Sequence, residues 1–412
     1  MDRNHDLTIS NKGVCKLEEL AINGGEPVRN TYLPYGRQWI DDEDIKEVIN
    51  TLKSDYLTTG PKIKEFEEKV AAYTKTQYAV AIVNGTAALH AACFAAGIGP
   101  GDEVITTPIT FAASANCILY CGAKPVFADI DPRTYNIDPE DIKRKITPKT
   151  KAIIPVHYTG QPVDIDEINK IAKQNNLIVI ADGAHALGAE YKGSIVGPQT
   201  DMMTLSFHPV KHITTGEGGM ILTNNKDYYE KLKLFRAHGI TRDENLLTKN
   251  EGPWYYEQQY LGYNYRITDI QAALGISQMN KLDNFLKIRR KYAQMYNNAF
   301  KDIEELIIPY QLPYTNSSWH IYVLQLRLEK LKVGRREIYE ALLKENIGVN
   351  VHYIPVYYHP YYKKLGYKKG LCPNAEHLYE RIITLPLFPK MTEEDVHDVI
   401  TAVKKVINYY KK

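Results

Sequence analysis

The residue best suited to covalent chemistry is Lys211, which stands in a stretch rich in glycine and threonine, shortly after an apolar run that ends at Ser206. An ammonium group is costly to remove from water. Partial burial therefore lowers the pKa of a lysine and leaves a neutral amine that can attack an aldehyde. A lysine in such a place can also extend into solvent and have no chemical role. The neighbouring residues therefore have to distinguish a reactive lysine from an ordinary surface lysine.

A carboxylate, Asp182, closes the apolar run that begins at Leu177, and His185 follows it three residues later. Ligands of α/β proteins bind at the carboxyl ends of the strands, where this carboxylate is expected. It could keep a pyridine nitrogen protonated, which makes the ring an acceptor of electrons. The alternative is a structural role as the N-cap of a following helix.

A turn suited to binding phosphate follows an apolar run at Asn84, Gly85 and Thr86. Where a strand, a glycine turn and a helix follow one another, the free N–H groups and the helix dipole attract an anion. The pattern is neither a P-loop, because no Lys-Ser/Thr pair follows, nor the Gly-x-Gly-x-x-Gly pattern of dinucleotide-binding proteins. An ordinary strand-to-helix turn has the same appearance.

These features occur in the order phosphate turn, acid and amine. Together they meet the needs of pyridoxal phosphate, which carries a phosphate, a ring nitrogen and an aldehyde. The sequence therefore predicts a pyridoxal-phosphate enzyme in which Lys211 and Asp182 are the catalytic residues.

The elements that position these residues belong to an α/β fold, since short apolar runs alternate with stretches of helical length between residues 78 and 223. Continuous apolar runs are typical of strands buried on both faces, and helix-length connections favour parallel pairing. The expected strands are Ala79–Val83, Glu103–Thr106, Pro125–Ala128, Ala152–Val156, Leu177–Ala181, Met203–Ser206 and Met220–Thr223.

One helix is expected on each side of this region. The first covers Asp41–Lys53, and its residues Ile45, Val48, Ile49 and Leu52 share one face. The second covers Arg266–Leu282, where Thr268 and Gln271 are spaced as a capping box.

The length of the chain suits one large and one smaller domain. We expect an N-terminal arm at residues 1–30, a large cofactor-binding α/β domain at residues 31–284 and a smaller α+β domain at residues 285–412. In the last, the pattern predicts strands at Ile321–Leu326 and Gly348–Tyr353 and helices at Arg335–Glu345 and Glu393–Tyr409.

The composition argues against several other classes of protein. The net charge of +2 does not favour nucleic acid or an anionic membrane as a partner. No apolar run approaches the roughly 18 residues of a membrane span, and the N-terminus lacks the apolar core of a signal peptide, so a cytoplasmic location is expected.

Five cysteines without a Cys-x-x-Cys pair favour buried free thiols over a metal site. The tyrosine- and histidine-rich segment 357–362 contains a proline and has no carboxylate nearby, which favours a loop over the cleft rather than a metal site.

At these residues the sequence resembles the DegT/DnrJ/EryC/StrS family of sugar aminotransferases. The resemblance runs from Leu20 to the last helix, and it includes the Asp-x-x-His turn at 182–185, the Ser-x-x-x-x-Lys stretch at 206–211 and Gly-Tyr-Asn-Tyr-Arg-Ile-Thr-Asp at 262–269. Within the family, a closer resemblance is to members of pseudaminic acid biosynthesis, through segments 34–38, 110–123, 351–356 and 372–375.

This resemblance implies a fold-type I aminotransferase dependent on pyridoxal 5'-phosphate, with a mainly parallel central sheet sandwiched by helices and a homodimer whose active site lies at the subunit interface. It also implies transfer of an amino group from L-glutamate to C4 of a UDP-linked 4-keto-6-deoxy-N-acetylhexosamine. The product would be UDP-4-amino-4,6-dideoxy-N-acetyl-β-L-altrosamine.

The resemblance also implies a role for individual residues. Lys211 would bind the cofactor covalently, Asp182 would pair with its ring nitrogen, His185 would lie near its ring hydroxyl, and Phe111 would stack on the ring. The phosphate would be held by Gly85, Thr86, Ser206 and, from the other subunit, Asn264. The candidates for contact with the sugar nucleotide are Thr59, Tyr265, Arg266, His352 and Tyr353.

One departure within the family concerns members that replace the lysine by histidine and act as dehydratases. Here His212 directly follows Lys211, but Lys211 keeps the position five residues after Ser206, so transamination is favoured. The alternatives are another nucleotide-sugar aminotransferase, acting at C3 or on a dTDP- or GDP-linked sugar, a cysteine desulfurase-like lyase, for which no reactive cysteine stands out, and a non-catalytic regulatory protein that binds pyridoxal phosphate.

Overall fold

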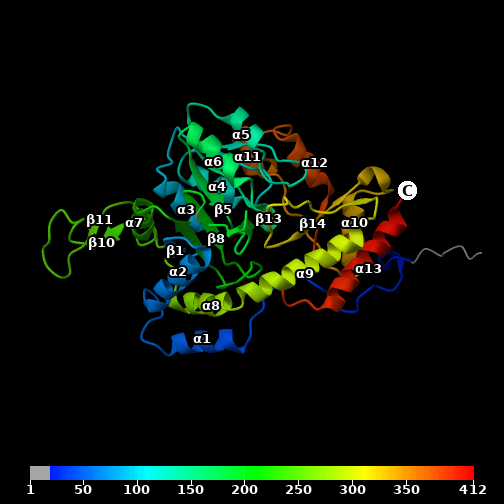
Figure 1. The fold of residues 1–412 in the computed structure, drawn as a ribbon, viewed down its shortest axis with the longest axis horizontal. Coiled ribbons are helices and arrows are strands. Elements are labelled where there is room, and N and C mark those ends of the chain that lie inside the picture. The colour runs from blue at the N-terminus through cyan, green and yellow to red at the C-terminus, as the bar shows by residue number, and fades with distance from the viewer. Residues whose placement is uncertain (1–18, 198) are drawn as a thin grey trace, which may run out of the picture.

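The computed structural model describes residues 19–197 and 199–412, and its centre is a seven-stranded sheet in the order β1-β9-β8-β5-β4-β2-β3 (Figure 1). Every strand predicted between residues 78 and 223 is present, and its ends lie within two residues of the predicted ones. The strands are β1 (Tyr78–Ile82), β2 (Glu103–Thr106), β3 (Lys124–Phe127), β4 (Thr150–Ile154), β5 (Ile178–Asp182), β8 (Met202–Ser206) and β9 (Gly219–Thr223).

The sheet is mainly parallel, as predicted, and β9 is the exception. It pairs antiparallel with both β1 and β8. The remaining ladders, which join β3, β2, β4, β5 and β8, are parallel. The connection from β8 to β9 at residues 207–218 contains no helix. A parallel crossover usually contains a helix, and this loop of twelve residues has none. It returns the chain antiparallel and carries Lys211.

Helices cover both faces of the sheet, which confirms the predicted sandwich. In β1, Ala79 and Ala81 belong to one apolar core and Val80 and Ile82 to another, because successive side chains of a strand point to opposite faces. The first core contains α2 (Pro61–Thr74), α6 (Ile165–Gln174) and α8 (Asp269–Met279). The second contains α3 (Gly85–Ala95), α4 (Ala113–Tyr120) and α7 (Lys226–Phe235).

The C-terminal part has its own core around a three-stranded antiparallel sheet of β12 (Leu306–Ile307), β14 (Tyr322–Leu326) and β15 (Ile382–Leu385). Its helices are α9 (Leu282–Phe300), α10 (Arg335–Lys344), α12 (Pro373–Arg381) and α13 (Glu393–Tyr410). The strand predicted at Gly348–Tyr353 is wrong, since only Asn350 forms a bridge there, with Thr384. The division at residue 284/285 stays a prediction.

The long helix α9 joins the two parts of the chain. Leu282 and Leu286 at its start lie in the first core of the central sheet, whereas Tyr292, Tyr296 and Phe300 lie in the C-terminal core. The remaining elements are short: α5 (Pro139–Lys145), α11 (Pro360–Lys364), the pair β10 (Ile240–Thr241) and β11 (Glu257–Gln258), and the sheet of β6 (Glu190–Tyr191), β7 (Ser194–Ile195) and β13 (Thr315–Asn316).

Both helices predicted at the edges of the large domain are present. The predicted capping box of Thr268 and Gln271 forms, and it starts α8 at Asp269, three residues after the predicted start. The first helix, α1 (Asp42–Leu52), has the predicted apolar residues, but Ile45, Ile49 and Leu52 are exposed on this chain.

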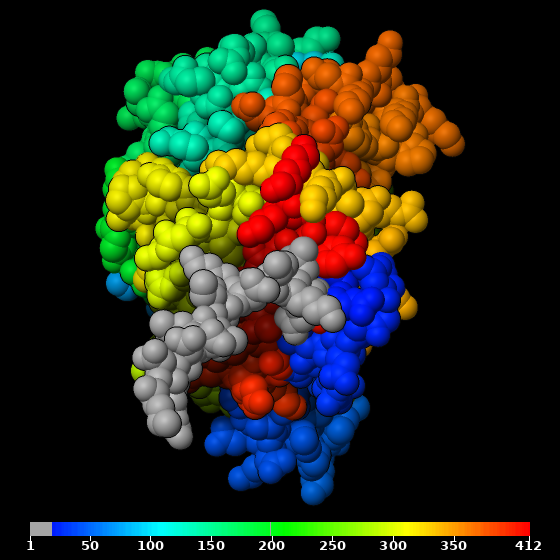
Figure 2. All heavy atoms as spheres, turned by 90° about the vertical axis from the view of Figure 1, so that its right-hand side faces the viewer, coloured from blue at the N-terminus to red at the C-terminus, as the bar shows by residue number. Residues whose placement is uncertain are grey.

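Residues 19–29 of the predicted N-terminal arm lie against the C-terminal part, whereas residues 1–18 of the arm lie outside the described residues. Figure 2 shows the first described residues, in blue, beside the red C-terminal helix. The Glu345 carboxylate accepts hydrogen bonds from the backbone N–H groups of Ala21 and Val28, and it pairs with Lys405 at 3.1 Å. Lys405 also donates to the carbonyl of Glu26. One buried ion pair therefore fixes this segment.

Cys93, Cys117 and Cys372 are buried free thiols, Cys121 is partly exposed, and Cys15 lies outside the described residues. Within residues 19–197 and 199–412, no helix has both the length and the apolar character that a membrane crossing needs.

Replacing Lys405 by methionine should lower the stability of the protein, because it leaves the Glu345 carboxylate buried without its counter-charge. We expect a loss of about 3 kcal/mol, measured by denaturant unfolding. The adjacent exposed Lys404 is the matched control, and Lys404→Met should change stability by less than about 0.5 kcal/mol. Equal effects of the two substitutions would contradict this account.

Candidate active site

A cleft of about 650 Å³ lies where β5 and β8 end, and it contains both residues predicted to be catalytic. Its walls come from the start of α3, the turn after β5, the loop after β8 and segment 350–353. Of the predicted residues, the cleft brings together Gly85, Thr86, Phe111, Asp182, His185, Ser206, Lys211, His352 and Tyr353.

Asp182 is the last residue of β5 and is only 5% exposed. Its Oδ2 accepts a hydrogen bond from the Ser114 hydroxyl at 2.6 Å, and its Oδ1 accepts one from the backbone N–H of Ala184 at 3.0 Å. Burial raises the pKa of Asp182, and Ser114, Ala184 and Lys211 oppose that rise. No helix begins directly after it, so Asp182 is not a helix N-cap.

Lys211 lies partly buried in the loop between β8 and β9. Burial lowers the pKa of Lys211 to about 8, Asp182 raises it and the nearby Arg289 lowers it. The lysine Nζ lies 3.4 Å from Nε2 of His320. Burial also lowers the pKa of His320, so this ring is neutral beside the amine at physiological pH. A substantial fraction of the amine is therefore neutral near physiological pH.

The guanidinium of Arg289, on α9, is fully buried and holds this region through backbone carbonyls. It donates to the carbonyls of His320 at 3.0 Å, Leu387 at 2.9 Å and Lys211 at 3.4 Å. Arg289 thus ties the lysine loop to two segments of the C-terminal part.

The predicted phosphate turn begins a helix. The side chain of Asn84 caps α3 by accepting from the N–H of Ala87 at 2.8 Å. The first N–H groups of a helix have no partner within it, and Gly85 and Thr86 line the cleft. A Cβ at Gly85 would lie 3.0 Å from Cβ of Ser206, so a larger residue would crowd the place where the turn and the end of β8 meet.

Aromatic and imidazole rings form the opposite wall of the cleft. The hydroxyl of Tyr353 lies 3.1 Å from Nε2 of His185, whose ring centroid lies 4.2 Å from that of His320. Nδ1 of His352 lies 3.0 Å from the hydroxyl of Thr384, which fixes its ring. Phe111 is 63% exposed, so its ring face is free to lie against a ligand.

Four predicted residues lie outside this cleft. Asn264 and Thr59 are exposed, and Arg266 is partly exposed. The Tyr265 hydroxyl lies 3.2 Å from Nδ1 of His90, near α3. His212, the residue that could be confused with the lysine, is buried and does not line the cleft.

The sequence analysis missed Ser114, His320 and Arg289. Ser114 lies in segment 110–123, which carries part of the resemblance, but only the fold places its hydroxyl against Asp182. No local signal points to His320 or Arg289, which reach Lys211 from 109 and 78 positions away along the chain.

The arrangement fits pyridoxal phosphate. One cleft offers a partly neutral amine, a buried carboxylate at a strand end, and a helix N-terminus where a glycine turn meets a serine. These groups match the aldehyde, ring nitrogen and phosphate of that cofactor. The mainly parallel sheet between helices and the composition of this cleft define a fold-type I pyridoxal-phosphate enzyme.

Comparison with known proteins gives the family. Residues 38–404 match the model of the DegT/DnrJ/EryC1/StrS aminotransferase family, and the chain belongs to this family. A relative from Bacillus subtilis, the spore coat polysaccharide biosynthesis protein SpsC, is 44% identical over 92% of this chain and 98% of its own length.

Two solved structures have the same fold. Helicobacter pylori PseC, an aminotransferase involved in the biosynthesis of pseudaminic acid, has a TM-score of 0.86 at 33% identity, over 92% of this chain and 100% of its own. Spr1654 from Streptococcus pneumoniae, described as a putative sugar aminotransferase, was solved in its PMP form. It has the same TM-score and identity, over 92% of this chain and 99% of its own. The chain is therefore a sugar aminotransferase dependent on pyridoxal phosphate.

The lowered pKa of Lys211 gives a testable pH dependence. In the protein freed of cofactor, reductive labelling of Lys211 by pyridoxal phosphate and borohydride should rise with pH through a midpoint near 8, because the neutral amine is the nucleophile. Peptide mass spectrometry reports the labelled fraction, and the exposed Lys226 serves as the control for general surface labelling. Labelling of Lys211 that rises only near 10.5, the ordinary pKa of a lysine, would contradict the effect of burial.

Proposed function

We propose that this enzyme transfers an amino group from L-glutamate to C4 of a UDP-linked 4-keto-6-deoxy-N-acetylhexosamine and forms UDP-4-amino-4,6-dideoxy-N-acetyl-β-L-altrosamine. The observation that carries the chemistry is the placement of Lys211 and Asp182 in one cleft. The choice of sugar rests on the likeness to PseC over nearly the whole chain.

In this proposal Lys211 has two roles. Its Nζ would hold the cofactor's aldehyde, and the same nitrogen would take the proton from Cα of glutamate. Pyridoxal phosphate, when bound, supplies a ring system that accepts the electron pair of the Cα–H bond of glutamate when that bond breaks. A pKa near 8 suits an amine that must act as a base and then as an acid near neutral pH.

The other predicted residues of the cleft hold the cofactor. Asp182 would pair with the ring nitrogen, His185 would lie near the ring hydroxyl, and Phe111 would stack on the ring. Gly85, Thr86 and Ser206 hold the phosphate through N–H and hydroxyl groups. His352 and Tyr353, on the wall across the cleft, contact the sugar.

We further propose a homodimer in which Asn264 reaches the phosphate in the partner's cleft. Asn264 is exposed and lies outside the cleft of its own chain, as do Arg266 and Thr59. Some large apolar side chains of this region are also open to solvent: Leu261 is 81% exposed, and Ile45, Ile49 and Leu52 of α1 are exposed. A subunit packed there would bury apolar area and bring Arg266 toward the sugar's diphosphate.

A second candidate is another nucleotide-sugar aminotransferase, with a different sugar or position of amination. This alternative is supported by the 44% identity to SpsC, because that relative is named for the biosynthesis of a different glycan, the spore coat polysaccharide. Assays with a panel of UDP-, dTDP- and GDP-linked keto sugars, followed by NMR of each product, separate the two candidates.

The purified enzyme should aminate the UDP-linked 4-keto sugar in the presence of glutamate, and Lys211→Ala should lose this activity and the absorbance of the lysine-bound cofactor. NMR of the product and release of 2-oxoglutarate measure the reaction. The exposed-site variant Lys226→Ala should behave like the wild type. Substantial turnover by Lys211→Ala would remove the lysine from its assigned role.

Asp182→Asn should lower kcat by several orders of magnitude, because a neutral amide cannot hold the ring nitrogen in its protonated form. The substitution keeps size and can keep the hydrogen bond from Ser114, so the cofactor should still bind. Absorbance measures whether the variant still binds the cofactor, and the single-turnover rate with glutamate measures the loss of catalysis. A rate near that of the wild type would exclude Asp182 from the reaction.

A further inference from the structure

The imidazole of His320 lies beside the amine of Lys211, the nitrogen on which the proposed chemistry depends. Its Nε2 lies 3.4 Å from Nζ of the lysine. No other side chain among residues 19–197 and 199–412 forms a hydrogen bond or an ion pair with Nζ. The distance is long for a hydrogen bond, as contacts of reacting groups often are before a ligand is bound. His320 is therefore the side chain best placed to act on this amine.

Backbone hydrogen bonds fix His320 in this place. Its N–H donates to the carbonyl of Thr159 at 2.8 Å, and its carbonyl accepts from the buried guanidinium of Arg289 at 3.0 Å. Two residues earlier, the hydroxyl of Ser318 donates to the carbonyl of His185 at 2.8 Å. The segment that carries the imidazole is thus held both by the chain that follows β4 and by α9.

Packing alone does not explain a histidine at this position. The residue is only 4% exposed, and it lines the cleft. Its Nδ1 has no hydrogen-bond partner in the part of the chain that the structure describes. A buried polar atom without a partner lowers the stability of a fold, and an apolar side chain of similar size would avoid this loss. A side chain that is unfavourable for stability, yet held firmly beside a reactive amine, points to a role in the reaction.

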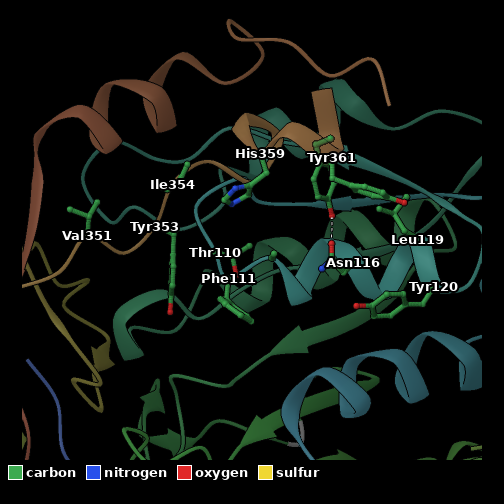
Figure 3. A pocket seen from close by; sticks show the side chains of 12 residues that line it. Thr110, Phe111, Asn116, Leu119, Tyr120, Val351, Tyr353, Ile354, His359 and Tyr361 are labelled. Atoms are coloured by element: carbon green, nitrogen blue, oxygen red, sulfur yellow. Dashed lines mark hydrogen bonds between the residues drawn. The ribbon is translucent and has the colours of Figure 1, made fainter. Parts of the chain in front are cut away.

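His320 belongs to a row of rings along one wall of the cleft. Its ring centroid lies 4.2 Å from that of His185, whose Nε2 lies 3.1 Å from the hydroxyl of Tyr353. Figure 3 shows Tyr353 from a neighbouring hollow between α4 and segment 351–362. Segment 357–362, predicted as a loop over the cleft, instead forms a 3₁₀ turn and α11 beside that hollow, and none of its residues lines the cleft.

The imidazole of His320 is neutral beside the lysine. Burial lowers the pKa of His320 well below the usual range of a histidine, and the charge of Lys211 lowers it further. A neutral imidazole has one nitrogen with a lone pair. If that nitrogen is Nε2, it accepts a hydrogen bond from an N–H of the amine and leaves the lone pair of the amine free for a ligand. The contact becomes stronger once the amine has taken up a proton, because its donor is then charged.

We propose that His320 is a positioning residue: its Nε2 accepts a hydrogen bond from Nζ of Lys211 and stabilises the ammonium form that the lysine reaches when it takes the proton from Cα of the amino donor. This inference rests on the role of Lys211 in the proposed function. The proton passes from Cα to Nζ, and His320 itself neither gains nor loses a proton. The other groups whose charge can act on this amine are Asp182, Arg289, His185, His212 and His352.

The test compares His320→Leu, which removes the acceptor, with His320→Gln, whose amide oxygen can take the place of Nε2. In the cofactor-free protein, the midpoint for labelling of Lys211 by pyridoxal phosphate and borohydride should fall by about one pH unit in His320→Leu, because the ammonium form loses its acceptor. His320→Gln should keep the midpoint of the wild type, near 8.

His212→Gln is the matched control for loss of a buried imidazole in this region. The ring centroid of His212 lies 5.6 Å from that of His320, and His212 does not line the cleft. This substitution should leave the labelling midpoint of Lys211 unchanged.

The reaction of the cofactor-loaded enzyme with glutamate alone gives a second readout. His320→Leu should slow this half-reaction about 10-fold or more, as expected for the loss of one hydrogen bond to a charged group, and His320→Gln should recover most of the rate. Deuterium at Cα of glutamate should slow His320→Leu more than the wild type, since proton transfer then limits the rate. Cofactor content by absorbance should be the same in all variants. Thermal unfolding should show no loss of stability in His320→Leu, because the unpartnered Nδ1 is removed.

The outcomes separate this inference from the proposed function. If the wild type aminates no nucleotide-linked keto sugar while the labelling midpoints change as stated, the proposed sugar fails and the role of His320 stands. An unchanged midpoint in His320→Leu, or equal midpoints in His320→Leu and His320→Gln, would overturn the inference. A midpoint that rises in His320→Leu would also overturn it, because the imidazole would then donate to the lone pair of the amine. If His320→Leu does not fold, His320→Asn, whose shorter amide does not reach the position of Nε2, takes its place with the same expected outcomes.

Discussion

The structure depends on holding an amine and a carboxylate in one poorly solvated cleft without a close ion pair between them. Burial disfavours both charges, since it lowers the pKa of Lys211 and raises that of Asp182. The attraction between the two charges partly offsets these pKa shifts. Each side chain is nevertheless contacted by groups other than its counter-charge. Ser114 and Ala184 bind the carboxylate, and His320 lies beside the amine. Both groups therefore stay available to a ligand that enters between them.

The sheet provides this arrangement through its topology. Asp182 ends β5 and Lys211 follows β8, and these neighbouring strands are parallel, so both residues emerge at the same edge. The return of β9 beside β8 then closes the loop that carries the lysine. At Gly183 a Cβ would lie 3.0 Å from the carbonyl oxygen of Thr204, which shows how closely the turn after β5 approaches β8.

Much of this could be predicted from the sequence, because apolar runs and turn residues are local signals. They located all seven strands and the capping box of α8. They also located the phosphate turn at residues 84–86, the carboxylate of Asp182 and the amine of Lys211. Contacts between distant positions leave no such signal, which is why Ser114, His320 and Arg289 were missed. The alternation at 348–353 resembles a strand, but the neighbouring β15 pairs with β14 instead and leaves only Asn350 bridged.

Helix α9 has a mechanical consequence. Its 19 residues form one rigid rod, about 28 Å long, whose two ends are embedded in different cores, with Arg289 between them. Opening the cleft by swinging one part of the chain against the other would require breaking this rod or pulling Arg289 off its carbonyls. The helix and the Arg289 guanidinium therefore couple the position of the lysine loop to the packing of the C-terminal part.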